Sequence, residues 1–582
     1  MRFICLALFV LLCGTANAQL LFKNVSVVDV EKKEINRGLY VLVVDGRIKL
    51  VSHELNTDIP PGTTSIDGTG KFLIPGLADG HVHFFQNGGI HTRPDVIDLR
   101  KSRPYSEELE WTYQQMEDQL RRYLSAGITS VIDVGSNFRL LQLRDSIQAK
   151  TSSPLIRMTG PLLTTYIPPA FKDLKDMDVP FQLMTDENKV RQMVEEQVSR
   201  KADFIKIWFI IDEKDAEADA RKKLPLVKAV IDEAHKNQLR VAVHATERIA
   251  AQLAVESGAD YLVHSVEDEV VSDEFVKLLQ KNKTALCPTL VVMANYITSL
   301  GDNYRFSTAE LNLANPFTVG SIIDFPFPDT ATGKVYITAM NRSEEIIKES
   351  KTDSIRRRNM KKLFDAGVTI VTGTDAGNIG TQHASSYFAE LQAMQRARLI
   401  PMEILQASTI NPAKALGQEK EWGSIAPGKI ANMVMLKRNP FDDLYNWSSI
   451  ELVINKGVAI SPDTLIQQTP EQLVQMQLNA YNAHDLDAFL VPYAEDVELY
   501  EYPSKLLSKG KEQMRKDYIF ITQTPKLYCR IQKREIKDNT VTDHEEVTFG
   551  GPSPYMLTQL ILLRMGRSVK CILSSERGMR IR

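Results

Sequence analysis

Hydrophobic residues in the middle of the chain follow two alternating patterns. Short apolar runs, typical of buried strands, are followed by stretches with apolar residues every three or four positions, typical of amphipathic helices. The strand-like runs are residues 72–83, 128–135, 154–160, 203–210, 239–246, 261–268, 285–292 and 368–377. Eight strands that alternate with helices predict an α/β fold, a (β/α)8 barrel of the TIM type over residues 71–420.

Both flanks of this region carry a β-rich pattern. Short β-runs separated by turns fill residues 19–70, where Asp45-Gly46 is a hairpin signal, and similar runs return at 421–460. Each flank has too few apolar faces to form a core alone. We therefore expect the two flanks to join in one composite β-sandwich beside the barrel.

The last part of the chain, residues 471–582, is predicted to be a separate α+β domain. Periodicity is lost at 461–470, which we interpret as a linker, and two amphipathic helices and a β meander follow. The segments AYNAHD (480–485) and DVELY (496–500) resemble the nuclear-transport-factor-2-like, or SnoaL-like, family, whose domains form cones. We interpret the domain as a binding or dimerisation module through which a homo-oligomer can form.

Composition and the N-terminus narrow the range of functions. The 582 residues include 70 basic and 73 acidic side chains, a net charge of -3 that argues against a nucleic-acid partner. Residues 1–18 have the pattern of a cleaved signal peptide, with Arg2, an apolar run and Ala16-Asn17-Ala18. No other run is long and apolar enough for a transmembrane helix, so we expect a secreted or periplasmic protein.

Several polar residues interrupt the apolar strand runs at the positions where a barrel of this type carries its catalytic groups. They are His81, His83, Lys206, His244, His264 and Asp375. In a strand, residues i and i+2 project from the same face, so His81 and His83 can hold one metal ion. A buried histidine can instead bond the backbone, and a strand lysine can extend to a rim. Six such residues on the strands of one barrel favour a metal site.

With these residues in this order, the sequence resembles the amidohydrolase superfamily over residues 19–461. The segments NPAKALG (411–417) and GSIAPGK (423–429) also resemble the C-terminal signature of that superfamily. Asn432 stands where members commonly have aspartate, a departure that falls in the flanking β region. The resemblance is to the imidazolonepropionase-like and prolidase-like branch, and it implies cleavage of an amide bond in a small cyclic amide or a dipeptide.

The resemblance also implies a metal-dependent mechanism. Two divalent ions, zinc by default with manganese or iron also compatible, would be bridged by Lys206 after its carbamylation. His81, His83 and Asp375 would bind one ion, and His244 and His264 the other. A hydroxide shared by the ions would attack the carbonyl, with Asp375 as the proton shuttle.

Substrate selection is expected in the loops that follow the strands. We predict that Arg93 or Arg100 binds a substrate carboxylate, although either can be a solvated surface charge. His383 lies in another loop of the same face and is a further substrate-binding candidate. The segment 294–333 is long and aperiodic, which is typical of a lid.

Two other functions remain open at this stage. One is a mononuclear deaminase or hydrolase of the same fold, which Lys206 argues against. The other is a catalytically inactive binding or scaffold protein, in which loss of metal ligands would be expected.

Overall fold

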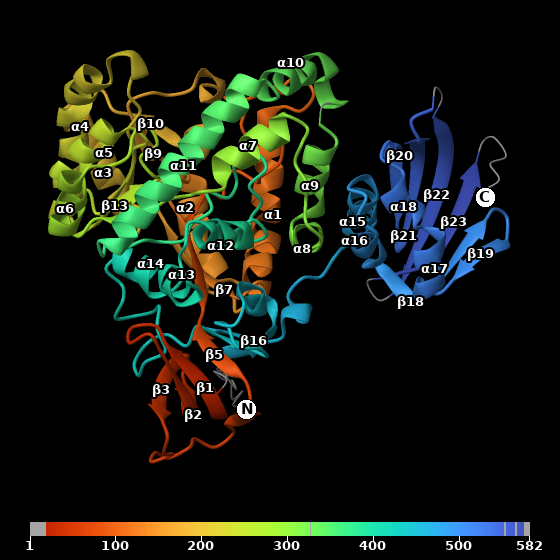
Figure 1. The fold of residues 1–582 in the computed structure, drawn as a ribbon, viewed down its shortest axis with the longest axis horizontal. Helices are drawn as coiled ribbons and strands as arrows, with labels where there is room; N and C mark the ends of the chain where they lie inside the picture. Colours follow the sequence, from red (N-terminus) through yellow and green to blue (C-terminus); the bar gives the residue numbers. More distant parts are fainter. Residues whose placement is uncertain (1–18, 326, 552–553, 565–566, 576–582) are drawn as a thin grey trace, which may run out of the picture.

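The computed structural model describes residues 19–325, 327–551, 554–564 and 567–575, and the predicted signal peptide lies outside them. The molecule has three parts: an α/β region in the middle of the chain, a β-sheet below it and a C-terminal α+β domain at its side (Figure 1). Among the described residues, the helices lack the combination of length and apolar character needed to cross a bilayer.

The parallel strands of the α/β region form two sheets. The three-stranded sheet contains β6 (Leu77–Val82), β7 (Ile128–Asp133) and β8 (Leu155–Met158). The six-stranded sheet has the order β10-β9-β11-β12-β13-β14. Its strands are β9 (Leu162–Thr164), β10 (Phe181–Leu183), β11 (Ile205–Trp208), β12 (Val241–His244), β13 (Tyr261–Val263) and β14 (Ala285–Cys287). The sequence predicted one eight-stranded barrel, and the described strands do not form one continuous ladder.

Two local features break that ladder. The predicted third strand, 154–160, is β8, and after Gly160-Pro161 the chain continues as β9 in the other sheet, because proline has no N–H to donate to a neighbour. The predicted eighth strand, 368–377, is not a regular strand but makes isolated bridges from Ile370 to Leu286 and from Ala376 to Val82. Asp375 and Gly377 have φ angles of 60° and 108°, which are incompatible with extended backbone. The segment nevertheless lies between β14 and β6.

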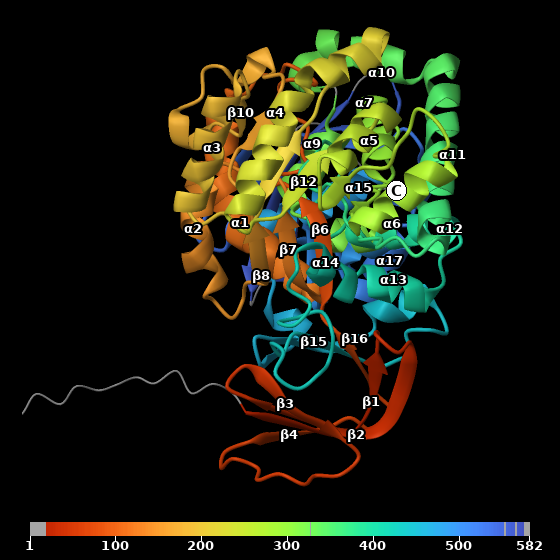
Figure 2. The same ribbon diagram turned by 90° about the vertical axis from the view of Figure 1, so that its left-hand side faces the viewer.

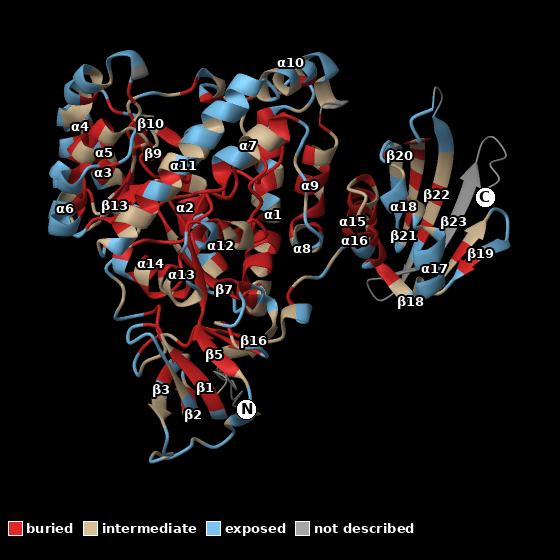
Figure 3. Ribbon diagram, in the orientation of Figure 1, coloured by how far each residue is buried: buried red, intermediate tan, exposed pale blue. Residues whose placement is uncertain are grey.

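Helices cover the outside of these sheets (Figure 2). They are α1 (Tyr105–Ser125), α2 (Phe138–Gln148), α3 (Glu187–Ser199), α4 (Ala216–Lys236), α5 (Arg248–Glu256), α6 (Asp273–Asn282), α11 (Ser343–Asp365), α12 (Tyr387–Arg396), α13 (Pro401–Ala407) and α14 (Ile410–Ala415). Their boundaries follow local chemistry, as in α6, where Ser272 caps the N-terminus by accepting from Phe275 N. The buried faces of helices and strands form the largest core of the molecule (Figure 3).

The two flanking segments join in one eight-stranded sheet, in place of two facing sheets. Its order is β17-β16-β15-β5-β1-β2-β3, with β4 paired to β1. The strands are β1 (Leu20–Asp29), β2 (Glu34–Val44), β3 (Arg47–Ser52), β4 (Thr64–Asp67), β5 (Phe72–Pro75), β15 (Met433–Leu436), β16 (Ile450–Asn455) and β17 (Val458–Ile460). β5 belongs to this sheet although its apolar run continues into β6, because Pro75-Gly76 separates the two strands. Its pairing with β15 links the two ends of the region.

The segment predicted as a lid loop is helical. It contains α7 (Val292–Leu300), α8 (Thr308–Leu313), α9 (Pro316–Ile323) and α10 (Thr330–Met340), which leads to α11. Ser307 and Glu310 form a capping box at the start of α8, and Asp329 caps α10. Several short helices do not share one continuous helical period of apolar residues. A segment that looks aperiodic in the sequence can therefore still be helical.

The C-terminal domain packs helices against a six-stranded sheet of order β19-β18-β23-β22-β21-β20. Its elements are α15 (Pro470–Asn482), α16 (Leu486–Leu490), β18 (Tyr493–Glu501), β19 (Lys505–Lys509), α17 (Lys511–Asp517), α18 (Phe520–Gln523), β20 (Tyr528–Lys537), β21 (Thr540–Thr548), β22 (Tyr555–Arg564) and β23 (Arg567–Ser575). The described pairs are antiparallel except β18 with β23, which is parallel. The domain begins with the two predicted helices, but α17 and α18 follow between β19 and β20. The nuclear-transport-factor-2-like assignment stays a prediction.

Candidate active site

A cavity of about 540 Å³ lies where the strands of the α/β region end. Six polar side chains that the sequence analysis selected line it: His81, His83, Lys206, His244, His264 and Asp375. They come from β6 and the residue after it, from β11 and β12, from the residue after β13, and from the segment that follows α11. The fold therefore brings together residues that are far apart in the sequence.

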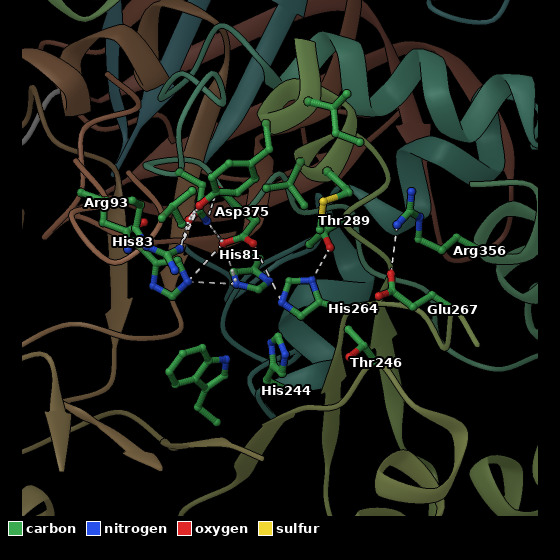
Figure 4. A pocket seen from close by; sticks show the side chains of 18 of the residues that line it. His81, His83, Arg93, His244, Thr246, His264, Glu267, Thr289, Arg356 and Asp375 are labelled. Atoms are coloured by element: carbon green, nitrogen blue, oxygen red, sulfur yellow. Dashed lines mark hydrogen bonds and ion pairs between the residues drawn. The ribbon is translucent and has the colours of Figure 1, made fainter. Parts of the chain in front are cut away.

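His81, His83 and Asp375 form the tight centre of this cavity (Figure 4). The Nε2 atoms of the two imidazoles lie 3.2 Å apart, and each is 3.2 Å from Oδ1 of Asp375. Three potential ligand atoms thus converge on one point. His264 approaches from the other side, with its Nε2 atom 3.9 Å from Oδ2 of Asp375.

Hydrogen bonds behind the imidazoles orient two of the rings. His83 Nδ1 is 2.8 Å from the Gly135 carbonyl oxygen, and His264 Nδ1 is 2.6 Å from the Thr289 hydroxyl oxygen. When Nδ1 carries the hydrogen, Nε2 keeps a lone pair directed at the centre. The two rings are therefore held as ligands through Nε2.

Asp79 supports the backbone of the site. Its carboxylate accepts from the backbone N–H of Thr374 at 3.0 Å and from the Thr374 hydroxyl at 2.7 Å. It therefore holds the backbone next to Asp375, one of the residues at the centre.

His244 and Lys206 complete the other side of the centre. The rings of His244 and His264 are 4.4 Å apart, and the Trp208 ring lies 6.0 Å from His244. Lys206 is 1% exposed, and its Nζ atom has no hydrogen-bond partner among the described residues. A buried amine without a hydrogen-bond partner destabilises the folded protein. We therefore expect an additional group to bind Lys206 Nζ.

Burial sets the protonation of these groups. It lowers the pKa of His81 to about 4, and it holds the pKa values of His244 and His264 well below the usual value. It also lowers the pKa of Lys206 to about 7. Neutral imidazoles and a neutral amine are the forms that bind metal or react with an electrophile.

Asp375 stays ionised in the same surroundings. Burial opposes its charge, but its interaction with the adjacent His81 and His83 rings outweighs burial and holds its pKa well below the usual value. Its backbone is in the left-handed region, as is that of His264 with a φ angle of 76°. Such conformations are uncommon outside glycine and concentrate at functional sites.

The donor set fits divalent cations. The ligand atoms of His81, His264 and Asp375 all lie within 4.8 Å of one another. Neutral imidazoles and a carboxylate suit zinc and its neighbours in the first transition row. The Lys206 amine, which has no hydrogen-bond partner among the described residues, is buried in the same cavity.

The three predicted substrate-binding residues lie in different places. Arg93 lines the cavity, but its Nε and Nη2 atoms grip Asp95 at 2.8 and 2.6 Å. Arg100 is exposed, does not line the cavity and pairs with Asp98 at 2.8 Å. Its contact with substrate stays a prediction that this position does not favour.

His383 does not line the cavity. It is 3% exposed, its Nε2 is 2.9 Å from the Gln86 carbonyl oxygen, and its ring stacks on Phe84. These contacts support the loop after β6, and the predicted contact of His383 with substrate stays a prediction.

Four further residues that the sequence did not point to also line the cavity. Trp208 stacks with Phe181 at 5.2 Å on one side, and Glu267 and Arg356 form an ion pair of 2.9 Å on the other. Trp208 follows Lys206 by two residues in one strand, so the strand period was a usable signal. Arg356 is on α11, and only helix packing brings it to Glu267.

This arrangement, with imidazoles and a carboxylate at the ends of parallel strands, is a candidate metal site in an α/β fold. Residues 72–460 match the amidohydrolase family, so the chain belongs to that family. It is a hydrolase of the kind that acts on carbon–nitrogen bonds.

Individual proteins are similar to the chain to different extents. An imidazolonepropionase of Shouchella clausii is 23% identical over 439 residues, which cover 70% of this chain and 81% of that protein. An adenine deaminase of Paracoccus denitrificans is 37% identical over 70 residues, 12% of each chain. Among solved structures, a Xaa-Pro dipeptidase with bound methionine in the active site has a TM-score of 0.56 and 21% identity, covering 76% of this chain and 100% of that chain.

Proposed function

We propose that this amidohydrolase cleaves an amide bond in a small cyclic amide or a dipeptide, with two divalent metal ions. The observation that carries the proposal is the convergence of six separate side chains, His81, His83, Lys206, His244, His264 and Asp375, on one cavity. Two of the similar proteins act on substrates of these kinds by name, an imidazolonepropionase and a Xaa-Pro dipeptidase.

The residues divide into two ligand groups in this proposal. His81, His83 and Asp375, whose ligand atoms converge at 3.2 Å, would hold one ion. His244 and His264 would hold the other. When bound, the two ions would polarise the carbonyl and lower the pKa of a water to about 7.

Lys206 would help to hold both ions after its carbamylation. Its pKa of about 7 leaves a large fraction of the amine neutral, and a neutral amine can add to CO2 to form a carbamate. The carbamate would supply two oxygens and a negative charge where the buried Nζ now has no partner in the described part of the chain.

Asp375 is the proton shuttle. Its Oδ1 atom contacts both imidazoles, whereas Oδ2 has the longer 3.9 Å contact with His264. Oδ2 would therefore accept the proton of the attacking water and return it to the leaving nitrogen. Water adds to the carbonyl carbon, and the carbon–nitrogen bond breaks as that nitrogen gains the proton.

The finer architecture and location belong to the same proposal. We infer that the two parallel sheets and residues 368–377 together make up a (β/α)8 barrel, because the bridges at Ile370 and Ala376 link β14 to β6. We also propose export by a signal peptide at residues 1–18, which N-terminal sequencing of the mature protein would test. We further propose that the C-terminal domain has the cone fold and that the protein dimerises through it. The molar mass in solution, measured by light scattering, would test the dimer.

Metal analysis of the purified full chain, combined with a screen of dipeptides and cyclic amides, tests the function. We expect about two ions per chain and hydrolysis of at least one substrate class. Lys206→Ala and Asp375→Ala should each lose nearly all activity. Arg100→Ala is the matched control and should retain activity, because Arg100 lies outside the cavity and pairs with Asp98.

The metal content also separates the alternatives. One ion per chain would favour a mononuclear deaminase or hydrolase, and a chain without ions or activity would favour a binding protein. Hydrolysis by Asp375→Ala at the rate of the unmodified protein would refute the proton shuttle.

A further inference from the structure

Asn378 lies beside the proposed catalytic carboxylate without being one of the proposed ligands. It is 3% exposed, lines the cavity and follows Asp375 by three residues. Its Nδ2 group donates to Asp375 Oδ1 at 2.7 Å and to the Asp375 backbone carbonyl at 3.1 Å. Oδ1 is also the oxygen that contacts His81 and His83.

The other end of the Asn378 amide has two donors. Its Oδ1 atom accepts from Arg93 Nη1 at 2.5 Å and from the Tyr296 hydroxyl at 2.5 Å. An asparagine side chain can be turned by 180° with little change in shape, so its partners decide which end is oxygen. A guanidinium donates and cannot accept, which assigns the oxygen to Arg93 and the NH2 group to Asp375.

Arg93 is itself held in place. Asp95 binds its Nε and Nη2 atoms, which leaves Nη1 directed at Asn378 and Tyr296. The pairing with Asp95 offsets the Arg93 charge, so this guanidinium is better suited to orient an amide than to attract a substrate carboxylate. Arg93 comes from the loop after β6, Tyr296 from α7 and Asn378 from the segment after Asp375, so three separate parts of the chain meet here.

We propose that Asn378 is a positioning residue that fixes Asp375, with Arg93 and Tyr296 fixing Asn378 in turn. The amide commits Oδ1 of Asp375 to the ligand position beside His81 and His83, and it thereby leaves Oδ2 for proton transfer. Two hydrogen bonds from one amide, to the side chain and to the backbone of Asp375, stop rotation of the carboxylate. This role rests on the proposed function of the site.

Asn378→Asp is the discriminating variant. An aspartate has the same shape and can still accept from Arg93 and Tyr296, but it cannot donate to Asp375 when ionised. The proposal expects kcat to fall about 10–100-fold, the range typical of residues that support metal ligands, with KM changed less than about threefold. Affinity for the more tightly bound ion, measured by zinc titration of the metal-depleted protein, should fall by a similar factor.

Asn439→Asp is the matched control. Asn439 also donates to an aspartate, Asp442, at 2.7 Å, but in an exposed loop after β15. It should leave kcat and zinc affinity unchanged. Tyr296→Phe, which removes one of the two donors to the Asn378 oxygen, should give a smaller loss than Asn378→Asp.

Two results would overturn the role of Asn378. One is a value of kcat and a zinc affinity for Asn378→Asp equal to those of the unmodified protein. The other is a parallel loss of thermal stability that explains the whole effect, which calorimetry of the metal-depleted variants would reveal. Failure of the proposed function looks different, because the unmodified protein would then bind no zinc and hydrolyse nothing, and the role of Asn378 would fall with it.

Discussion

Lys206 is the residue at which burial and charge conflict most directly. The side chain is 1% exposed, and burial lowers its pKa from 10.5 to about 7. A group that loses its proton so readily in the folded protein destabilises the fold whenever it is charged. The presence of lysine at this position is therefore best explained by the reactivity of its neutral amine.

Lys206→Met should stabilise the metal-depleted protein while it abolishes hydrolysis. The folded pKa lies below the unfolded one, so the penalty is complete below about pH 7 and disappears above about pH 10.5. At pH 7 we expect a gain on the order of 3 kcal/mol, since a tenfold change in a protonation equilibrium corresponds to about 1.4 kcal/mol. The unfolding free energy of the unmodified protein should rise with pH across this window, and that of Lys206→Met should rise less.

Urea unfolding at several pH values in CO2-depleted buffer would measure both slopes. If the unfolding free energy changed equally with pH in both proteins, or if Lys206→Met were less stable, burial of the charged amine would not destabilise the fold.

The segment 368–377 positions Asp375 beside the histidines although it is not a regular strand. A Cβ atom on Gly373 would lie 2.5 Å from Cys287 Sγ and 2.7 Å from His81 N. Glycine is thus required for the segment to approach both β14 and β6. That approach, with the hydrogen bond of 2.7 Å from Asp375 N to the His81 carbonyl oxygen, brings Asp375 to the histidines.

Gly373→Ala should disturb the metal site through the backbone. The added methyl group has to displace either β14 or the backbone of His81, at a cost of about 2 kcal/mol by analogy with overpacked cores. We expect a lower melting temperature and a loss of bound metal. Gly551→Ala is the control, because a Cβ there meets no described atom within 4 Å. Unchanged metal content in Gly373→Ala would contradict this account of the segment.

At the scale of the whole molecule, the C-terminal domain is packed against the α/β region through α8 and α9. Leu311, Ala314 and Val319 share a hydrophobic core with residues of α15 and α16. The Asn479 amide donates to the Pro316 carbonyl oxygen at 2.7 Å. The domain therefore contacts the α/β region directly as well as through the linker, and Figure 1 shows it beside α9.

Glu545 makes the stability of this domain depend on pH. It is 7% exposed on β21, and burial, together with the charge of Asp543, raises its pKa to about 8. Because the folded pKa exceeds the usual 4.5, this contribution to stability is complete below about pH 4.5 and is lost as pH rises through 8.

Glu545→Gln should remove that dependence. We expect the variant to be more stable than the unmodified protein at pH 8, on the order of 3 kcal/mol, with the difference shrinking toward pH 5. Scanning calorimetry across pH 5–8 measures it. Glu546→Gln, a neighbour on the opposite face of the same strand, is the control, and an equal change in both variants would refute the assignment.

The sequence by itself determined the local chemistry. The apolar runs located the strands that carry His81, Lys206 and His244. This was possible because the spacing of apolar residues along the chain follows the local geometry of strands and helices. The joining of both flanks in one sheet was also predictable, since neither had enough apolar surface alone. The family resemblance supplied the expected ligand set.

The tertiary structure decided everything that depends on distance between segments. Arg93 and His383 looked like substrate residues in the sequence, yet Asn378 and Tyr296 hold the first and Gln86 the second. The partners of Asn378 come from parts of the chain some 80 and 285 residues away. A sequence pattern records which side chains a strand presents, but hydrogen bonds between distant segments exist only after packing has brought their atoms within about 3 Å.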